Sequence, residues 1–304
     1  MTTSVSVIVV TYNSQGCVQA CLDSLKSQQA SPGEIVVIDN ASTDDTLQIV
    51  RKNSFITGLI ENKTNRGFGA AVNQGISRAQ GEYLLVLNSD VVLESDFLKN
   101  LDSEVQTFPS RRIGMIAPLI FDTGGRIDSA GLYLTFLRRF YDRGRGARED
   151  GRFHSAGFVF GACGACAVYK REMLEDIKIE GEYFDEDFFL CVEDVDAAWR
   201  AHALGWQAWY APKLRCAHQG GISRKRSKEG QCCAFRNRYF LLIKNESSRG
   251  AVRFFLFCWI YDVPRLFLLL LTNPRIFQAL GEIRRLWPRM IEKRRAIAKK
   301  HIQI

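Results

Sequence analysis

Three short apolar runs stand near the start of the chain, and each one ends in a polar cluster. They are Val5–Val10, Glu34–Ile38 and Tyr83–Leu87. Segments with apolar residues at helical spacing separate them, most clearly Cys17–Gln28 and Gly67–Ala79. Continuous apolar strands that alternate with helices are typical of a mostly parallel sheet covered by helices on both faces. We therefore predict an α/β fold with such a sheet.

The polar clusters that follow these runs are candidates for a binding site, because ligands bind at the carboxyl ends of parallel strands. The clusters are Thr11-Tyr12-Asn13, Asp39 and Asn88-Ser89-Asp90. A carboxylate such as Asp39 can accept the N3–H of a uracil or thymine ring, although an acid there can also cap the next helix. A carboxylate such as Asp90 can hold Mg²⁺ or Mn²⁺ against a diphosphate, or can belong to a turn.

Six carboxylates gather farther along the chain, with Phe and Val residues between them. They are Asp185, Glu186, Asp187, Glu193, Asp194 and Asp196. Crowded carboxylates raise one another's pKa, which suits a general base that accepts a proton from an alcohol. The alternative is that they favour the N-terminus of a helix beginning near Glu193. Of the four histidines, His218 is a candidate, and it is either structural or a metal ligand.

The sequence contains no Walker lysine loop and no G-x-G-x-x-G, which argues against an NAD or ATP site. The net charge of +8 is unevenly spread. Residues 1–220 carry 22 basic and 28 acidic side chains, a net −6, whereas residues 221–304 carry 19 and 5, a net +14. An acidic body with a basic tail is unlike a nucleic-acid-binding protein, so we expect no nucleic acid partner.

The basic tail contains the apolar segment Phe254–Leu271, which Asp262, Pro264 and Arg265 interrupt. A charge in the middle of a membrane span is costly, so we predict two short apolar helical pieces at an interface. Basic residues flank the segment, at Arg224-Lys225-Arg226, Arg284-Arg285, Lys293-Arg294-Arg295 and Lys299-Lys300. This pattern is typical of attachment to an anionic membrane surface. The alternative is packing on the body or on a second copy of the chain, as a homodimer.

The N-terminus, Met1–Ser4, has neither the basic segment nor the cleavage site of a secretory signal. We therefore expect a cytoplasmic protein, peripheral on the inner face of the plasma membrane. Nine cysteines in such a chain are expected to be reduced thiols. The alternative is a zinc site made by Cys163 and Cys166 together with Cys232-Cys233.

Four further stretches follow one another in a recognisable order: Val7–Ser14, Val37–Asp44, Asn65–Gly75 and Leu87–Asp90. With Phe184–Phe189, Glu193–Asp196, Gly205-Trp206, Arg236–Arg238 and Lys244-Asn245, they resemble the family-2 inverting glycosyltransferases of GT-A (Rossmann-like) fold. The rhamnosyltransferase-like subgroup is the most similar. The resemblance covers about residues 4–245. It implies a GT-A nucleotide-sugar domain at residues 1–245, followed by a helical, basic and apolar extension at residues 246–304.

The resemblance implies a role for each matching residue. The donor nucleotide would be bound by Thr11, Tyr12, Asn13, Asp39, Arg66, Gly67, Asn88 and Ser89. The metal, Mg²⁺ or Mn²⁺, would be bound by Asp90 and His218. The catalytic base would be Asp194, with Glu193 beside it, and the sugar and acceptor would contact Gly161, Ala162, Cys163 and Trp206. This sequence departs from the family's DxD motif in having Asn88 where the first acid stands.

The implied reaction transfers a sugar, first of all L-rhamnose, from a dTDP- or UDP-sugar to a hydroxyl of a glycan or polyprenyl-diphosphate-linked saccharide in cell-surface polysaccharide synthesis. The alternative donor is another UDP-sugar, such as galactose, GlcNAc or galactofuranose. A sugar-nucleotide nucleotidyltransferase would need a glycine-rich basic loop where Thr11–Ser14 stands. A non-catalytic nucleotide-sugar-binding protein would not need Asp39, Asp90, Asp194 and His218 together.

Overall fold

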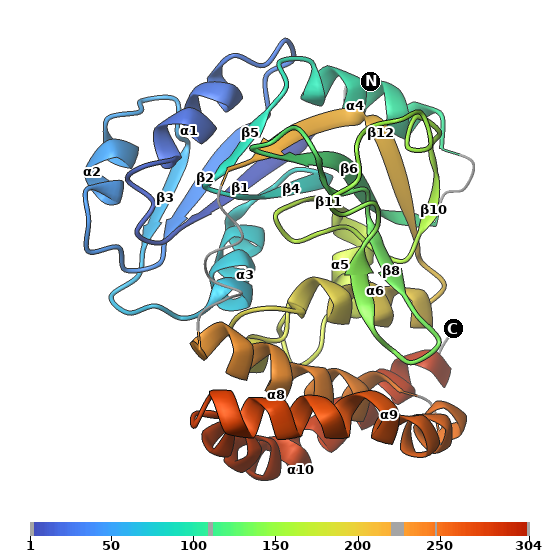
Figure 1. The fold of residues 1–304 in the computed structure, drawn as a ribbon. Helices are drawn as coiled ribbons and strands as arrows, with labels where there is room; N and C mark the ends of the chain where they lie inside the picture. Colours follow the sequence, from blue (N-terminus) through green and yellow to red (C-terminus); the bar gives the residue numbers. More distant parts are fainter. Residues whose placement is uncertain (1–2, 109–111, 220–227, 247, 303–304) are drawn as a thin grey trace.

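The computed structural model describes residues 3–108, 112–219, 228–246 and 248–302, and it describes side chains in these ranges except at residues 248–259 and 301–302. Figure 1 shows a sheet with helices on both faces, and a layer of long helices beneath it. The predicted basic cluster Arg224-Lys225-Arg226 lies outside the described residues.

A ten-stranded sheet forms the centre, in the order β10-β12-β6-β11-β4-β1-β2-β3, with β5 beside β12 and β7 beside β6. Strands β3, β2, β1, β4, β6 and β12 run in one direction, and β11 runs the opposite way between β4 and β6. The predicted α/β fold with a mostly parallel sheet is thus confirmed. The strands are β1 Val5–Thr11, β2 Glu34–Asp39, β3 Gly58–Glu61, β4 Tyr83–Asn88, β5 Val91–Leu93, β6 Ile113–Asp122, β7 Ile127–Ser129, β10 Gly157–Val159, β11 Cys166–Lys170 and β12 Gln207–His218. A separate hairpin pairs β8 Leu132–Leu134 with β9 Phe140–Asp142.

Helices cover both faces of the sheet because its strands are apolar on both sides. In β1, Val7 and Val9 join one core cluster, whereas Ile8 and Val10 join the other. The first cluster includes α1 (Val18–Lys26), α2 (Thr46–Arg51) and α4 (Phe97–Gln106). The second includes α3 (Phe68–Arg78), α5 (Arg171–Ile177) and α6 (Glu193–Ala203). A short 3₁₀ helix, η1 (Glu186–Phe188), precedes α6.

The helical layer consists of α8 (Lys228–Asn245), α9 (Ser248–Thr272) and α10 (Ile276–Ile302) (Figure 1). It packs on the body through a cluster in which Phe188 and Val195 meet Phe240, Ile243 and Met290. This helical layer therefore shares a core with the segment that carries the predicted catalytic pair.

The prediction of two apolar pieces within residues 254–271 is wrong, since α9 is a single helix that contains Pro264. Its charged residue Asp262 is buried, and its carboxylate lies 2.7 Å from the guanidinium of Arg238 on α8. The charge is therefore accommodated by an ion pair within the layer and does not require a break in the helix.

Candidate active site

Asp39 lies at the end of β2, opposite Thr11 at the end of β1. Its carboxylate is buried and accepts hydrogen bonds from the Thr11 hydroxyl (2.9 Å), the Ser42 hydroxyl (2.6 Å) and the Ser42 N–H (3.0 Å). Asp44, and not Asp39, accepts the N–H of Thr46 at the start of α2. The helix-capping alternative for Asp39 is therefore not supported, and three hydrogen bonds hold its carboxylate at the sheet edge.

Two loops interlock beside Asp39. The side-chain oxygen of Asn13 accepts the N–H of Thr43 at 2.8 Å, which ties the loop after β1 to the loop after β2. The N–H of Arg66 donates to the side chain of Asn40 at 3.0 Å, which brings the loop before α3 to the same place. Gly67 is left-handed, with φ of 85°, and a Cβ there would lie 2.5 Å from the carbonyl oxygen of Phe189. The structure thus brings the predicted nucleotide-side residues of three loops together.

Asp90 and His218 also come together, from the turn after β4 and the end of β12. The Nε2 atom of His218 lies 3.3 Å from Oδ1 of Asp90. On the other side of the ring, Nδ1 lies 2.8 Å from Oδ2 of Asp128 in β7. Ser89, between Asn88 and Asp90, donates to the hydroxyl of Ser14 at 2.8 Å. Asp128 was not expected from the sequence, because no motif marks it and its partner is 90 residues away.

The surroundings of His218 fit a metal ligand. Burial favours the neutral ring, but the neighbouring Asp128 and Asp90 carboxylates raise the pKa of His218 to about 9. Its Nε2 is buried and makes no well-aligned hydrogen bond with the described residues. A bound metal would replace the proton on Nε2; with Nδ1–H donating to Asp128, these residues would then match a metal-bound histidine oriented by a carboxylate. Within the described ranges, no group of three His, Cys, Asp or Glu side chains could hold a metal ion.

The predicted base, Asp194, lies in the first turn of α6 next to the predicted sugar loop. Its Oδ2 accepts the N–H of Gly164 at 2.8 Å. The same loop packs on α6, where a Cβ at Gly161 would lie 2.7 Å from the Cβ of Ala198. Glu193 is buried beside it. The structure therefore places Asp194 against the loop that contains Gly161, Ala162 and Cys163.

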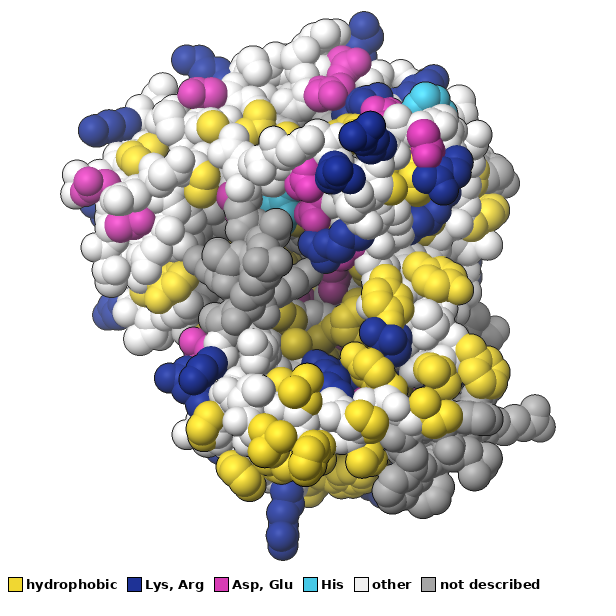
Figure 2. All heavy atoms as spheres, in the orientation of Figure 1, with side chains coloured by type: hydrophobic (Ala, Val, Ile, Leu, Met, Phe, Trp, Pro, Cys, Tyr) yellow, Lys and Arg dark blue, Asp and Glu magenta, His cyan; other side chains and the backbone are white. Residues whose placement is uncertain are grey.

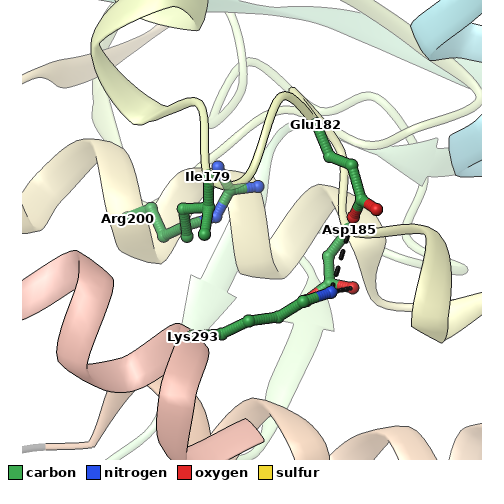
Figure 3. A pocket seen from close by; sticks show the side chains of 5 residues that line it. All are labelled: Ile179, Glu182, Asp185, Arg200 and Lys293. Carbon is green, nitrogen blue, oxygen red and sulfur yellow. Dashed lines mark hydrogen bonds and ion pairs between the residues drawn. The ribbon is translucent and has the colours of Figure 1, made fainter. Parts of the chain in front are cut away.

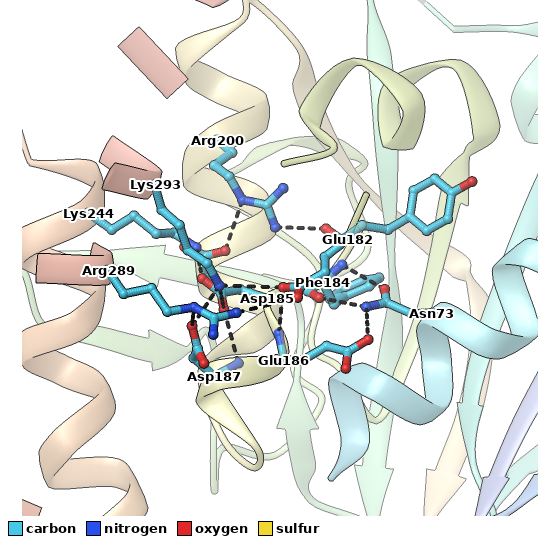
Figure 4. A network of polar contacts seen from close by, with 12 residues as sticks. Asn73, Glu182, Phe184, Asp185, Glu186, Asp187, Arg200, Lys244, Arg289 and Lys293 are labelled. Carbon is cyan, nitrogen blue, oxygen red and sulfur yellow. Dashed lines mark hydrogen bonds and ion pairs between the residues drawn. The ribbon is translucent and has the colours of Figure 1, made fainter. Parts of the chain in front are cut away.

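The expectation that the crowded acids raise one another's pKa is wrong for Asp185. Burial opposes its ionisation, but the ammonium groups of Lys244 and Lys293, each 2.5 Å away, hold the pKa of Asp185 well below its usual range. Figure 4 shows these lysines reaching the acids from the helical layer. Asp196 is likewise paired, with Lys244 at 2.8 Å and Arg200 at 2.9 Å. Most of these acids therefore bind cations and are not available as bases.

The prediction that Lys293 belongs to a basic flank at a membrane surface is wrong. Lys293 is 1% exposed and contacts Asp185, Asp187 and Glu182. Figure 3 shows Lys293 beside a small space lined by Ile179, Glu182, Asp185, Arg200 and Lys293. This space has no room for a water molecule, so it is a gap within the ion-pair network and not a ligand pocket.

The structure does not support the acceptor role predicted for Trp206. This residue precedes β12, and the carboxyl end of that strand, with His218, is at the opposite edge of the sheet. Trp206 is 1% exposed, and its indole N–H donates to Asp176 at 2.9 Å. It is a core residue, and its pairing with Gly205 in a motif could not distinguish that role from sugar binding.

Figure 2 shows that one face of the molecule is hollowed between the sheet part and the helical layer, with acidic side chains at the hollow. The sequence profile described as Glycosyl transferase family 2 matches residues 6–178. The chain belongs to glycosyltransferase family 2. The match covers Asp39 and Asp90, whereas Asp194 and His218 lie beyond it.

Two relatives show how far the likeness of this family member extends. The poly-beta-1,6-N-acetyl-D-glucosamine synthase of Staphylococcus epidermidis is 26% identical over 216 residues, which are 70% of this chain and 49% of the relative. The chain thus spans about half the length of that relative. The N-acetylglucosaminyl-diphospho-decaprenol L-rhamnosyltransferase of Mycobacterium tuberculosis is 25% identical over 271 residues, which are 82% of this chain and 86% of the relative.

Solved structures confirm the GT-A fold. S. aureus TarS 1-349 in complex with UDP-GlcNAc has a TM-score of 0.63 and 20% identity, over 99% of this chain and 92% of that one. The mannosyltransferase PcManGT from Pyrobaculum calidifontis, in complex with GDP-Man and Mn²⁺, has a TM-score of 0.59 and 18% identity, over 100% of this chain and 87% of that one. Both likenesses extend through the helical layer.

Proposed function

We propose that the chain is an inverting glycosyltransferase that moves a sugar from a nucleoside diphosphate sugar to a hydroxyl of a glycan or lipid-linked saccharide in cell-surface polysaccharide synthesis. One observation carries the proposal. Three groups lie at the same end of the sheet: Asp39 beside Thr11, Asp90 beside His218, and Asp194 against the loop of Gly164. We assign the first to the nucleobase, the second to a metal and the third to the acceptor hydroxyl. Each can serve one part of such a reaction.

In the proposed reaction, Asp194 accepts the proton of the acceptor hydroxyl, whose oxygen attacks the anomeric carbon. The bond from that carbon to the diphosphate breaks on the opposite face, so the configuration inverts. Asp39 accepts the N3–H of the base and fixes the donor. Asp90 and the Nε2 of His218 would hold Mg²⁺ or Mn²⁺, which when bound neutralises charge on the departing diphosphate. Asp128 keeps the His218 ring in the orientation that presents Nε2.

The proposed donor is dTDP-L-rhamnose. The support is the mycobacterial relative, which is named as an L-rhamnosyltransferase and matches this chain over most of both lengths. A UDP-sugar such as UDP-GlcNAc is the second candidate, because the staphylococcal relative is named as an N-acetylglucosamine polymer synthase and TarS was crystallised with UDP-GlcNAc. A structural neighbour crystallised with Mn²⁺ supports a divalent metal.

The donor is tested by thermal shift with dTDP-rhamnose, UDP-GlcNAc, UDP-galactose and UDP-galactofuranose, each with Mg²⁺ or Mn²⁺. A ligand at 100 times its Kd stabilises the folded chain by about 2.7 kcal/mol. We expect dTDP-rhamnose with metal to raise Tm, and Asp39→Asn to abolish the rise. Sugar transfer is then measured with the stabilising donor and a polyprenyl-diphosphate saccharide. No shift with any of the four donors would contradict the proposal.

We further propose that α9 and α10 lie on an anionic membrane, at the inner face of the plasma membrane. Apolar side chains that are 45–71% exposed lie along these two helices. On α9 they form one stripe at helical spacing, made of Ile260, Val263, Phe267, Leu268 and Leu271. On α10 they are Phe277 and Trp287. Figure 2 shows apolar side chains gathered over this layer. Exposed arginines adjoin them on α10, at Arg284 and Arg285. Among the described residues, no helix combines the length and apolarity needed to cross a membrane.

This stripe supports membrane attachment because an apolar helix face with basic neighbours binds in the interfacial plane of a bilayer. The charged Asp262 of α9 does not oppose it, since that carboxylate points to Arg238 inside the layer. Attachment would place the catalytic site near a lipid-linked acceptor. The alternative occupant of the stripe is a second copy of the chain.

A further inference from the structure

The turn that leads into α6 has an unusual backbone. Phe189, Cys191 and Val192 have φ values of 59°, 71° and 69°, in the left-handed region that residues other than glycine rarely adopt. Val192 is β-branched and directly precedes Glu193 and Asp194. Such conformations persist only where the surrounding structure holds them, and they gather at functional sites. We call residues 187–192 the left-handed turn. Its path determines where α6 begins and therefore where Asp194 lies.

A single side chain of α8 binds three carbonyl groups of this turn. Asn237 is 0% exposed, and its Nδ2 lies 2.8 Å from the carbonyl oxygens of Phe188 and Leu190 and 2.9 Å from that of Cys191. Its Oδ1 accepts the Nε–H of Arg236 at 3.0 Å, which fixes the orientation of the amide.

Arg236 adds two more hydrogen bonds to the same turn. Its guanidinium donates to the carbonyl oxygens of Asp187 (3.2 Å) and Phe188 (2.9 Å), and its other end pairs with Glu282 of α10. Because backbone carbonyls are held, the contacts fix the path of the main chain and not merely one side chain. The left-handed turn is therefore held from the helical layer.

The opposite side of the turn contacts the two loops of the proposed active site. The carbonyl oxygen of Phe189 accepts the N–H of Phe68 at 2.7 Å, directly after Gly67 of the nucleotide-side loop. Two residues after the turn, in α6, Asp194 accepts the N–H of Gly164 in the sugar loop. The turn is thus a connection from α8 to both loops.

We propose that Asn237 and Arg236 are positioning residues for catalysis: they hold the left-handed turn so that Asp194 meets the sugar loop and Phe189 meets the nucleotide-side loop. This inference rests on the proposed function and deepens it. The helical layer then contributes directly to the geometry of the reaction, in addition to any attachment. Asn237 and Arg236 contact the turn and not the reacting atoms.

The test compares Asn237→Ala with Asn273→Ala in the full chain. Asn273 is a matched control, since it is also a 0% exposed asparagine of the helical layer, its Nδ2 donates to the carbonyl oxygen of Lys228 at 2.8 Å, and it does not contact the turn. Both variants lose a buried amide, so a general loss of stability affects both. Hydrogen–deuterium exchange is followed in two peptides, residues 65–70 and 187–195, neither of which contains a substitution.

We expect Asn237→Ala to speed exchange in both peptides by about ten-fold or more, because their amides are protected by the held turn, whereas Asn273→Ala leaves both peptides close to wild type. With the donor found by thermal shift, kcat of Asn237→Ala should fall by about ten-fold or more, since misplaced catalytic groups lose rate steeply. The donor KM should rise by less than kcat falls, because the nucleotide-side loop loosens while Thr11 and Asp39 still hold the donor.

Equal exchange in the two variants, or an equal loss of kcat, would overturn the inference and leave Asn237 as an ordinary stabilising residue. A wild-type chain that transfers no sugar would instead refute the proposed function. In that case the exchange of residues 187–195 still decides whether Asn237 holds the segment that carries Asp194, so the two failures are distinguishable.

Discussion

Replacing Lys293 by Met should destabilise the protein strongly, although Lys293 belongs to a tail rich in basic residues. Its ammonium is buried and lies 2.5 Å from Asp185, 2.7 Å from Asp187 and 3.4 Å from Glu182. Burial favours the neutral amine, but Asp185 and Asp187 raise the pKa of Lys293. Met keeps a similar length and removes the charge, so the substitution isolates the ion pairs.

Removing one partner of a buried ion pair costs about 3–5 kcal/mol, because the other charge stays buried without compensation. Asp185 keeps Lys244 at 2.5 Å, so we expect the lower end, about 3 kcal/mol. At roughly 2 °C per kcal/mol for a chain of this size, Tm should fall by about 6 °C.

The free energy of unfolding is measured by urea denaturation of wild type, Lys293→Met and the control Lys299→Met. Lys299 is exposed on the same helix, so its replacement should change the free energy by less than about 0.5 kcal/mol. A cost below about 1 kcal/mol for Lys293→Met would refute the reasoning, since it would mean that the three acids do not need this cation.

The pH dependence gives a second check. The pKa of Asp185 is lowered in the folded protein, so its contribution is complete above its unfolded value, about 4, and is lost as the pH falls toward the folded value. In Lys293→Met the pKa of Asp185 in the folded protein rises, so ionised Asp185 contributes less stability and less stability is lost in acid. The stability gap between wild type and variant should therefore narrow between pH 5 and pH 3, at about the range where unfolded Asp protonates; a constant gap would count against the ion pairs as its cause.

Three further predictions concern the proposed site and surface. Asp194→Asn should lower turnover by about 10²-fold while donor binding in the thermal-shift assay is kept; turnover that survives with donor binding lost would contradict its role as base. Phe267→Ser combined with Leu268→Ser should weaken flotation with anionic liposomes by about 30-fold or more, since burying each side chain contributes about 1–2 kcal/mol. The control Phe158→Ser, at a residue that is 56% exposed in β10, should leave flotation unchanged. If the double variant floats like wild type but forms a smaller oligomer, the stripe binds a second copy of the chain and not a membrane. Asp128→Asn should weaken Mn²⁺ binding in the presence of UDP by about 10-fold, as followed by electron paramagnetic resonance, and an unchanged affinity would contradict its orienting role.

The half of the sheet that begins the chain could be predicted from sequence because its signals are local. Each of β1, β2 and β4 is a continuous apolar run, and the polar residue that ends it, such as Asp39, must lie at the carboxyl edge. The long strands β6 and β12 were not predicted. The sequence around both strands lacks a regular apolar pattern. They also pair in parallel although they are far apart in the chain, with a register shift between Ala211 and Arg215.

The partners of the site residues could not be predicted, because they depend on contacts between residues far apart in the chain. The spacing of apolar residues in the sequence does not reveal such contacts. His218 was predicted from the family resemblance, but its partner Asp128 comes close only because β6 pairs with both β7 and β12. Lys293 has the composition of a solvated residue, and only the approach of α10 to Asp185, 108 residues earlier, makes it a core residue. The prediction for Trp206 errs in the opposite direction: a residue expected to bind sugar is part of the core. A tryptophan in a motif can serve packing as well as binding.

The ion pairs between Asp185 and the helical layer also limit how such enzymes can be recombined. A chimera joined near residue 245 would combine one protein's acids with another protein's α10, and any mismatch would leave Asp185 buried opposite a neutral or repulsive side chain. Changes at residues 182–187 and at Lys293 should therefore be inherited as a unit. The two regions are distant in the chain, yet exchange of one without the other is penalised, so their divergence should be correlated among related sequences.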